Sequence, residues 1–183
     1  MPFTVLAVCT GNICRSPAVE VLLRGVLDGS VTVGSAGTHA VVGHPVSAPM
    51  AELLTADGFP ATGFAARQLV PTLVERADLV LALTPAHRAA VVEQVPGAVR
   101  RTLTLRELGR LSGTLGPGAV AGSDDAARLA ALLPAAVAER PRHAGREHDD
   151  VVLDPYGHSA ATYRRSYDQL VDALTPVLEV LRA

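Results

Sequence analysis

Short apolar runs alternate with segments of helical period over the first two thirds of the chain. Short apolar strands separated by helices indicate a parallel sheet that is covered on both faces. We therefore expect a three-layer α/β/α fold with a four-stranded parallel sheet. The predicted strands are 3–8, 31–36, 79–83 and 101–105, and helices are expected to begin near Ser16, Ser47 and Pro85.

The clearest helical period lies near the carboxyl end of the chain. Seven apolar or aromatic side chains fall on one face of a predicted helix, which packs on the core. Pro176 is expected to kink this helix. The seven residues are Tyr163, Tyr167, Leu170, Val171, Leu174, Leu178 and Leu181.

The run Cys9-Thr10-Gly11-Asn12-Ile13-Cys14-Arg15-Ser16-Pro17 directly follows the first apolar run. A loop of this length between a strand and a helix can turn its backbone N–H groups toward one tetrahedral anion. Ser16 and Pro17 predict an N-cap and a first-turn proline, and Gly11-Asn12 tolerates positive φ. The helix N-terminus and Arg15 favour a thiolate at Cys9, and the planar guanidinium can hold two phosphoryl oxygens.

Taken singly, Cys9 fits an ordinary buried thiol and Arg15 a surface charge. Their spacing, with Gly, Asn, Ser and Pro placed around them, indicates a phosphate site with a nucleophile. In open parallel sheets such sites lie at the carboxyl ends of strands, which is where Cys9 is expected.

The stretch CTGNICRSP resembles the signature loop of the low-molecular-weight protein tyrosine phosphatases. This resemblance implies a flavodoxin-like, phosphotyrosine phosphatase I-like fold and a phosphocysteine intermediate. It implies that Cys9 is the nucleophile, that Arg15 binds the phosphate and that Ser16 donates to the thiolate. Asn12 would also hold the loop in shape. The loop residues that would bind the substrate or its phosphate are Thr10, Gly11, Asn12, Ile13, Cys14 and Ser16.

Asp154 precedes a proline in Val-Leu-Asp-Pro-Tyr, and the proline stiffens that loop. Asp-Pro pairs are also common in turns without a catalytic role. The family resemblance implies that Asp154 is the general acid, because the family carries its acid in such a loop before the last helix. Tyr156 would flank the mouth of the pocket and stack on a substrate ring, or else pack on the final helix.

Other segments extend the resemblance over most of the chain. Ser35, in Ser-Ala-Gly-Thr after the second predicted strand, corresponds to the family's serine that supports the signature loop. Many members have a histidine three residues before the arginine that is Arg67 here, whereas this chain has Phe64. The hydrogen-bond network behind the loop is therefore expected to be rebuilt.

The stretch of about 107–149 is longer than the resemblance accounts for, and we interpret it as a helical insertion within a single phosphatase domain, 1–183. A helix is predicted from 123–125 to about 139, interrupted by Pro134, with a loop over 141–148. Such an insertion fits either a lid or a passive elaboration of the surface. Its flexible connection is predicted from Gly113, Gly116, Pro117, Gly118 and Gly122.

Composition excludes several classes of function. All 16 Lys or Arg positions are arginine, and the chain has 18 acidic side chains, so the net charge is −2. Without lysine, a Walker-type loop and a Schiff-base enzyme are excluded, and the absence of a basic block argues against nucleic-acid binding. No signal peptide or membrane-spanning run is evident, which predicts a cytoplasmic protein without membrane insertion. The absence of lysine, together with abundant Ala, Val, Leu and Arg, indicates a GC-rich bacterial genome. The histidines are scattered, and neither a metal nor another cofactor is expected.

Both cysteines of the chain, Cys9 and Cys14, lie in the signature loop, which excludes a structural disulfide framework. Cys14 could trap an oxidised Cys9 as a reversible disulfide, as members of the family with this second cysteine are thought to do. The alternative is a small side chain that fills space under the loop.

Substrate preference is expected to depend on Ile13. Related phosphatases that act on phosphoarginine carry threonine there, whereas tyrosine phosphatases carry isoleucine, which packs against an aromatic ring. We therefore expect tyrosine-phosphorylated proteins as substrates, with a tyrosine kinase as counterpart. Other segments, including Val152-Leu153-Asp154-Pro155, also resemble the arginine phosphatases. Two alternatives share parts of this site. An arsenate reductase would use further cysteines outside the loop, and this chain has none. A phosphotyrosine-binding pseudophosphatase would need neither Cys9 nor Asp154.

Overall fold

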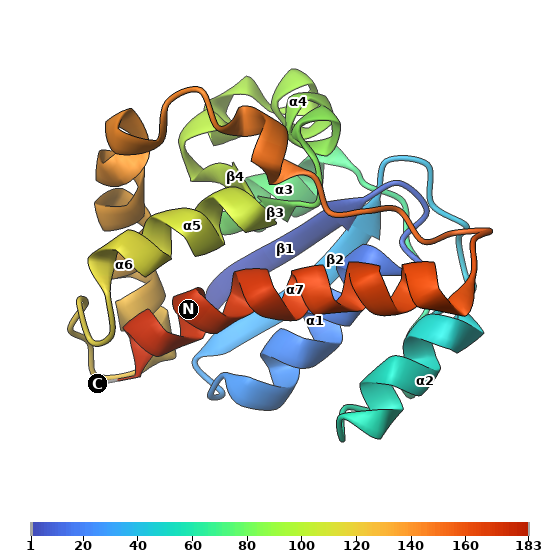
Figure 1. Cartoon of the computed structure of the whole chain (residues 1–183). Coiled ribbons are helices and arrows are strands. Elements are labelled where there is room, and N and C mark those ends of the chain that lie inside the picture. The colour runs from blue at the N-terminus through green and yellow to red at the C-terminus, as the bar shows by residue number, and fades with distance from the viewer. Residues whose placement is uncertain (1, 183) are drawn as a thin grey trace.

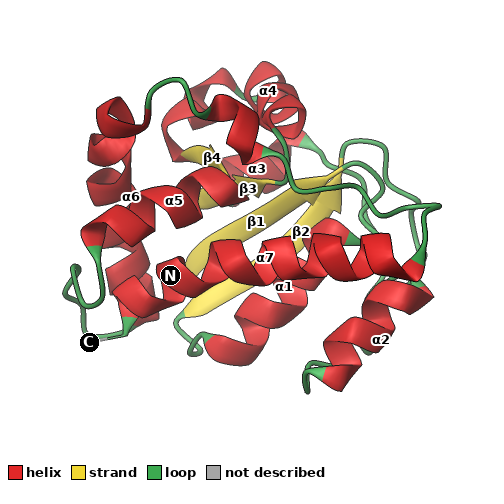
Figure 2. Cartoon of the chain, in the orientation of Figure 1, coloured by secondary structure: helices red, strands yellow, loops and turns green. Residues whose placement is uncertain are grey.

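A computed structural model describes residues 2–182 of the chain, with the backbone alone for residue 147. Four parallel strands form one sheet in the order β2-β1-β3-β4, and helices cover both of its faces (Figures 1 and 2). The three-layer fold is the predicted one. The strands are β1 (Phe3–Cys9), β2 (Val31–Gly37), β3 (Leu79–Ala82) and β4 (Thr102–Thr104).

The alternation of side chains along β1 divides the core into two parts. Val5, Ala7 and Cys9 belong to a large cluster with α1, α5, α6 and α7, whereas Leu6 and Val8 belong to a smaller cluster with α3 and α4. Figure 1 shows α1 and α7 crossing the near face of the sheet. The α-helices are α1 (Arg15–Val26), α2 (Ala48–Ala56), α3 (Pro71–Arg76), α4 (Pro85–Gln94), α5 (Leu105–Leu115), α6 (Asp125–Glu139) and α7 (Ala160–Leu181), and the 3-10 helices are η1 (Pro96–Arg101), η2 (Arg140–His143) and η3 (Glu147–Asp150).

Helix α1 begins one residue earlier than predicted. Arg15 is its first residue and Cys14 occupies the N-cap position, so the N-cap expected at Ser16 is wrong. The Ser16 hydroxyl instead lies 2.9 Å from the Cys9 sulfur. Pro17 is in the first turn, as predicted, where its missing N–H costs no helical hydrogen bond.

The predicted flexible connection is partly helical. Gly113 lies within α5, which begins with a capping box in which Thr104 and Glu107 bond each other's backbone N–H groups. Buried Leu108 and Leu111 attach this helix to the core, which outweighs the low helical propensity of one glycine. The predicted loop over 141–148 likewise contains 3-10 turns, in η2 and η3.

Helices α6 and α7 run through their prolines as single elements, so neither Pro134 nor Pro176 ends a helix. Most of the predicted apolar face of α7 is buried. Val171 is 37% exposed and was assigned to that face wrongly, whereas Val177 and Val180 are buried in the core. Among the described residues, no helix is both long and apolar enough to cross a membrane.

Candidate active site

The loop between β1 and α1 is held by the segment that follows β2. The N–H groups of Thr38, His39 and Val41 donate to the carbonyl oxygens of Cys9, Thr10 and Gly11, at 2.9–3.0 Å. The N–H of Ser47 donates to the Ile13 carbonyl at 2.7 Å. Because the N–H and C=O of a trans peptide point in opposite directions, these contacts leave the loop N–H groups for the concave side.

Gly37 permits this close contact between the two segments. A Cβ at this position would lie 2.4 Å from the Thr10 carbonyl oxygen, which is closer than any side chain allows. The end of β2 can therefore meet the loop only as glycine.

Asn12 lies at the centre of the loop and is fully buried. Its φ of 54° is in the left-handed region that asparagine tolerates, as predicted for this position. Its side-chain amide donates to the hydroxyls of Ser16 and Ser35 at 2.9 and 2.8 Å, and its carbonyl oxygen accepts from the Arg67 N–H at 2.8 Å. The side chain thus connects the loop with α1, β2 and the segment before α3.

A buried carboxylate extends this network. The Ser35 hydroxyl donates to Glu20 on α1 at 2.6 Å, and the Arg67 guanidinium donates to the Ser35 carbonyl at 2.6 Å. Phe64, at the position where many members of the resembled family have a histidine, packs against the core. Glu20 was missed in the sequence, since a glutamate in the first turns of a helix carries no signal of such a role.

The Cys9 sulfur lies at the base of the loop. Residue Cys9 is only 2% exposed. It is 2.9 Å from the Ser16 hydroxyl and 3.3 Å from the Asn12 N–H, which donates to it. Hydrogen bonds of this kind stabilise an anionic sulfur relative to the neutral thiol.

Arg15 and Asp154 meet at the mouth of the loop. One Arg15 nitrogen donates to Asp154 Oδ2 at 2.6 Å, and the other terminal nitrogen donates to the Val152 carbonyl at 3.1 Å. The Val152 N–H in turn donates to the carbonyl of Leu83, the residue after β3, and this bond anchors the loop of Asp154 to the sheet. The Asp154 side chain is 52% exposed, so it can reach a ligand that enters from solvent.

A cavity of about 200 Å³ opens above this loop. Tyr156 lies at its rim and is 63% exposed, so it is not packed within the core. None of the described residues that line it comes from 107–149. The residues predicted for the site that line this cavity are Cys9, Thr10, Gly11, Ile13, Cys14, Arg15, Asp154 and Tyr156, and two that were not predicted are His39 and Val41.

His87 on α4 also contacts the loop and was missed in the sequence. Its Nε2 lies 2.9 Å from the Thr10 hydroxyl, and its Nδ1 lies 3.0 Å from the Thr84 hydroxyl. Burial, together with the nearby Arg15 charge, lowers the pKa of His87 to about 4. The imidazole is therefore neutral at pH 7 and acts as a hydrogen-bonding strut beside the loop.

Cys14 is a free, buried thiol that lines the same cavity as Cys9. Its sulfur lies 3.1 Å from the Ser47 hydroxyl and 3.7 Å from the Tyr163 hydroxyl. Burial raises the pKa of Cys14 above its ordinary value. Cys14 is thus held as a neutral thiol. Within the part of the chain that the structure describes, no three His, Cys, Asp or Glu side chains are grouped to hold a metal ion.

Residues 4–112, which include the strands, the loop and α4, match the sequence profile of the low molecular weight phosphotyrosine protein phosphatases. The chain belongs to this family. Its members are hydrolases that remove phosphate from proteins, which agrees with the resemblance drawn from the loop.

Named relatives of this phosphatase fall into two groups. A protein-arginine-phosphatase from Geobacillus stearothermophilus is 38% identical over 182 residues, covering 100% of this chain and 98% of that protein. The low molecular weight protein-tyrosine-phosphatase Etp of Escherichia coli K12 is 42% identical over 100 residues, covering 55% of this chain and 67% of that protein. The solved arginine phosphatase YwlE of Geobacillus stearothermophilus superposes with a TM-score of 0.71 at 28% identity, covering 97% of this chain and 92% of that one.

Proposed function

We propose that this phosphatase hydrolyses phosphotyrosine in proteins through a phosphocysteine intermediate. The observation that carries the proposal is the convergence of three groups on one cavity: the Cys9 sulfur at its base, the Arg15 guanidinium, and the Asp154 carboxylate hydrogen-bonded to Arg15. A nucleophile, a phosphate-binding fork and a proton donor are what transfer of a phosphoryl group to sulfur requires.

The first step forms a sulfur–phosphorus bond and breaks the phosphorus–oxygen bond of the ester. The Cys9 thiolate attacks phosphorus in line while the loop N–H groups and Arg15 hold the three other oxygens. A phosphate that binds Arg15 displaces Asp154 from the guanidinium nitrogen that donates to it at 2.6 Å. The Asp154 carboxylate, freed from Arg15, takes up a proton from solvent, and the resulting carboxylic acid protonates the departing phenolate oxygen.

The second step returns the enzyme to its starting state. The Asp154 carboxylate, now deprotonated, takes a proton from a water molecule that attacks the phosphocysteine. The sulfur–phosphorus bond breaks, inorganic phosphate leaves, and Cys9 is again a thiolate beside Ser16 and the Asn12 N–H.

An aromatic leaving group is favoured by the side chains around the cavity. Ile13 and Val41 supply apolar surface, and the exposed Tyr156 ring stands at the rim. A flat phenyl ring can pack on all three of these side chains, and none of them offers a carboxylate that would pair with a charged guanidinium. Tyrosine-phosphorylated proteins are therefore the proposed substrates, and a tyrosine kinase is the proposed counterpart that supplies them.

Phosphoarginine in proteins is the second candidate substrate. It is favoured by the relative that aligns over the whole chain, including 107–149, and that is named a protein-arginine-phosphatase. The same cysteine, arginine and aspartate serve either reaction, so the choice concerns the leaving group alone.

Phosphate release from a phosphotyrosine peptide and a phosphoarginine peptide, measured side by side, tests the proposal, with Cys9→Ser as the blank. We expect selective turnover of phosphotyrosine. Ile13→Thr should move the ratio of the two kcat/KM values toward phosphoarginine by roughly 10- to 200-fold, the range that one pocket contact supplies. If the unaltered enzyme preferred phosphoarginine, the proposed substrate would be wrong and the proposed mechanism would stand. No turnover of either peptide would favour a reductase or a phosphotyrosine-binding role.

Cys14 is proposed to protect the nucleophile from oxidation. Peroxide would convert Cys9 to a sulfenic acid, and attack by the Cys14 sulfur would form a disulfide and release water. We expect activity lost to hydrogen peroxide to return with dithiothreitol in the unaltered enzyme and to be lost permanently in Cys14→Ala. Equal recovery in both proteins would leave Cys14 a space-filling side chain.

The remaining proposals concern the setting of the enzyme. We propose that 1–183 forms a single phosphatase domain and that it works in the cytoplasm, because a catalytic thiol needs a reducing compartment. The cytoplasmic location can be tested by blocking free thiols in intact cells and then separating the protein by non-reducing electrophoresis. We expect Cys9 to be found reduced.

A further inference from the structure

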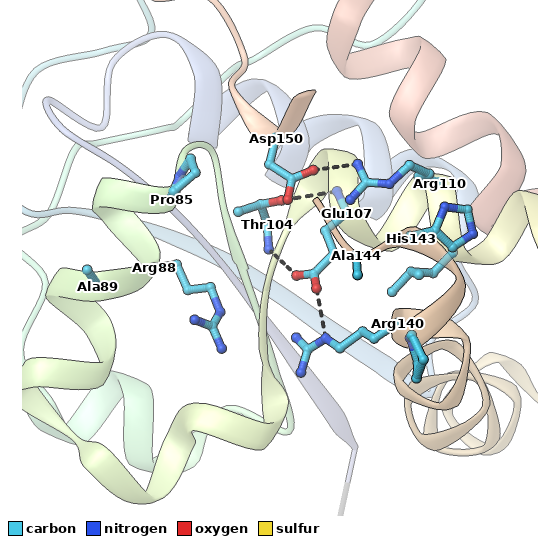
Figure 3. A pocket seen from close by; sticks show the side chains of 12 residues that line it. Pro85, Arg88, Ala89, Thr104, Glu107, Arg110, Arg140, His143, Ala144 and Asp150 are labelled. Carbon is cyan, nitrogen blue, oxygen red and sulfur yellow. Dashed lines mark hydrogen bonds and ion pairs between the residues drawn. The ribbon is translucent and has the colours of Figure 1, made fainter. Parts of the chain in front are cut away.

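A second cavity, of about 460 Å³, lies apart from the signature loop. It is enclosed by α4, the start of α5, and the η2 segment together with the residue that follows it (Figure 3). No residue lines both this cavity and the one above Cys9. Its volume falls within the range of small-molecule pockets, roughly 300–1,000 Å³.

Positive charge exceeds negative charge among the lining side chains. Arg110 pairs with buried Asp150, and Arg140 Nε pairs with Glu107 at 2.8 Å. Arg88 is held by the carbonyl oxygens of Thr102 and Val99 and, among the described residues, by no carboxylate. Three guanidinium groups therefore face two carboxylates, and the charge of Arg88 is left uncompensated.

Arg88 and Arg140 retain donors for a ligand. Arg88 comes from α4 and Arg140 from η2, and Figure 3 shows both guanidinium groups reaching into the space between these elements. Within the described chain, Arg140 uses only Nε for its ion pair, and Arg88 uses Nε and one terminal nitrogen. The unused N–H groups can hold a carboxylate or a phosphoryl group from two sides.

Most of the other side chains that line the cavity are apolar, and the exceptions are Thr104 and His143. The exposed residues Pro85 and Ala89 on α4 line the cavity together with the exposed Pro141 and Ala144. Prolines and short aliphatic side chains provide rigid surface for a hydrocarbon body but no polar partner. An inorganic ion would leave this surface in contact with water, whereas a ligand with an anionic head and an apolar body would cover it.

We propose that this cavity binds a small organic anion, with a carboxylate or phosphoryl head group between Arg88 and Arg140 and an apolar body against Pro85, Ala89 and Pro141. The site is distinct from the catalytic pocket, and the proposal does not depend on which phosphoprotein the enzyme acts on.

Nuclear magnetic resonance of the ¹⁵N-labelled full chain separates the two pockets by position. Phenylphosphonate, which the enzyme cannot hydrolyse, and benzoate serve as probes. The Ala89 and Arg140 amide signals report binding at this cavity, and the Gly11 and Ile13 signals report binding at the signature loop. We expect the Ala89 and Arg140 signals to shift and to saturate, with a dissociation constant different from the one that the loop signals give. A shift with phenylphosphonate alone would assign a phosphoryl head group, and one with benzoate alone a carboxylate.

Substitutions of matched charge test the role of the guanidinium groups. Arg140→Gln and Arg88→Gln should each weaken binding at the cavity by about 10-fold or more, the loss expected for charge-assisted hydrogen bonds, and should leave binding at the loop unchanged. Arg142→Gln is the control, because Arg142 is exposed on the same 3-10 helix, pairs with Glu139 and does not line the cavity. Signals at the cavity that fail to shift with either probe, or an equal loss in Arg142→Gln, would overturn the proposal.

Discussion

The Arg15 guanidinium lies 2.6 Å from the Asp154 carboxylate, although 139 residues separate them in the chain. The ion pair joins the first residue of α1 to the loop before α7. Arg15 is buried and Asp154 is half exposed, so the carboxylate is the partner that can move. The proposed acid is thus held next to Arg15, the group that an incoming phosphate would bind.

Replacing Asp154 with asparagine should slow turnover of a phosphotyrosine peptide by roughly 100- to 10,000-fold, because the amide cannot protonate the leaving oxygen. Substrate affinity should stay close to that of the unaltered enzyme, since Arg15 and the loop are unchanged. Steady-state kinetics with the peptide measure both effects. Asp149→Asn is the control, as Asp149 pairs with Arg146 outside the catalytic cavity. An unchanged kcat in Asp154→Asn would remove Asp154 from the mechanism.

Asn12→Ala should lower the free energy of unfolding by about 2–4 kcal/mol, because three buried hydrogen bonds are lost at about 1 kcal/mol each. Asn12→Gly loses the same bonds but tolerates the φ of 54°, so it should be more stable than Asn12→Ala by about 1 kcal/mol. Urea unfolding of the three proteins measures these differences. If the alanine and glycine variants were equally stable, backbone strain at residue 12 would not contribute.

His87 should make the stability of the fold depend on pH between about 4 and 6.5. Its pKa is about 4 in the folded chain, whereas an exposed histidine titrates near 6.5, so the unfolded chain binds a proton first as the pH falls. The stabilisation is complete above pH 6.5 and is lost progressively toward pH 4, with a total on the order of 3 kcal/mol.

Urea unfolding at several pH values should therefore show a flatter pH dependence in His87→Gln than in the unaltered protein. His158→Gln serves as the control, because His158 is exposed. Parallel curves for His87→Gln and the unaltered protein would mean that the folded and unfolded chains protonate residue 87 alike.

Two glycines of α5 should respond to alanine in opposite directions. A Cβ on Gly109 would lie 2.4 Å from the Ala173 carbonyl oxygen on α7, whereas the nearest atom to a Cβ on Gly113 is 3.8 Å away. Gly109→Ala should destabilise the protein by about 1–3 kcal/mol through overpacking. Gly113→Ala should stabilise it by about 0.5–1 kcal/mol, because alanine is the better helix former. Thermal unfolding followed by circular dichroism compares them, and equal melting temperatures would refute close packing at Gly109.

The catalytic loop was accessible to sequence reasoning because its residues are contiguous. Cys9 and Arg15 lie within one short stretch, and the local chemistry of Gly11 and Asn12 predicts its shape. Asp154 required the family resemblance, since an Asp-Pro pair by itself is a common turn. The strands were predictable because both faces of the sheet are buried, which produces continuous apolar runs.

His87 and Glu20 behind the loop could not be predicted, because only the tertiary fold brings them to it. His87 reaches Thr10 across 77 residues, and Glu20 meets Ser35 across 15, with no periodicity that marks either. The error at Gly113 has a different origin. A glycine was read as a break, although the capping box at Thr104 and Glu107 begins a helix that core leucines hold in place.

The carbonyl contacts between the signature loop and the segment after β2 also have a consequence for how quickly and how selectively an anion binds. With the carbonyls of Cys9, Thr10, Gly11 and Ile13 already engaged, the backbone loses little freedom when a ligand arrives. Association should then be limited by diffusion and desolvation of the anion, and tetrahedral oxyanions of similar size should compete on nearly equal terms. Sulfate and phosphate in a buffer would therefore inhibit this enzyme.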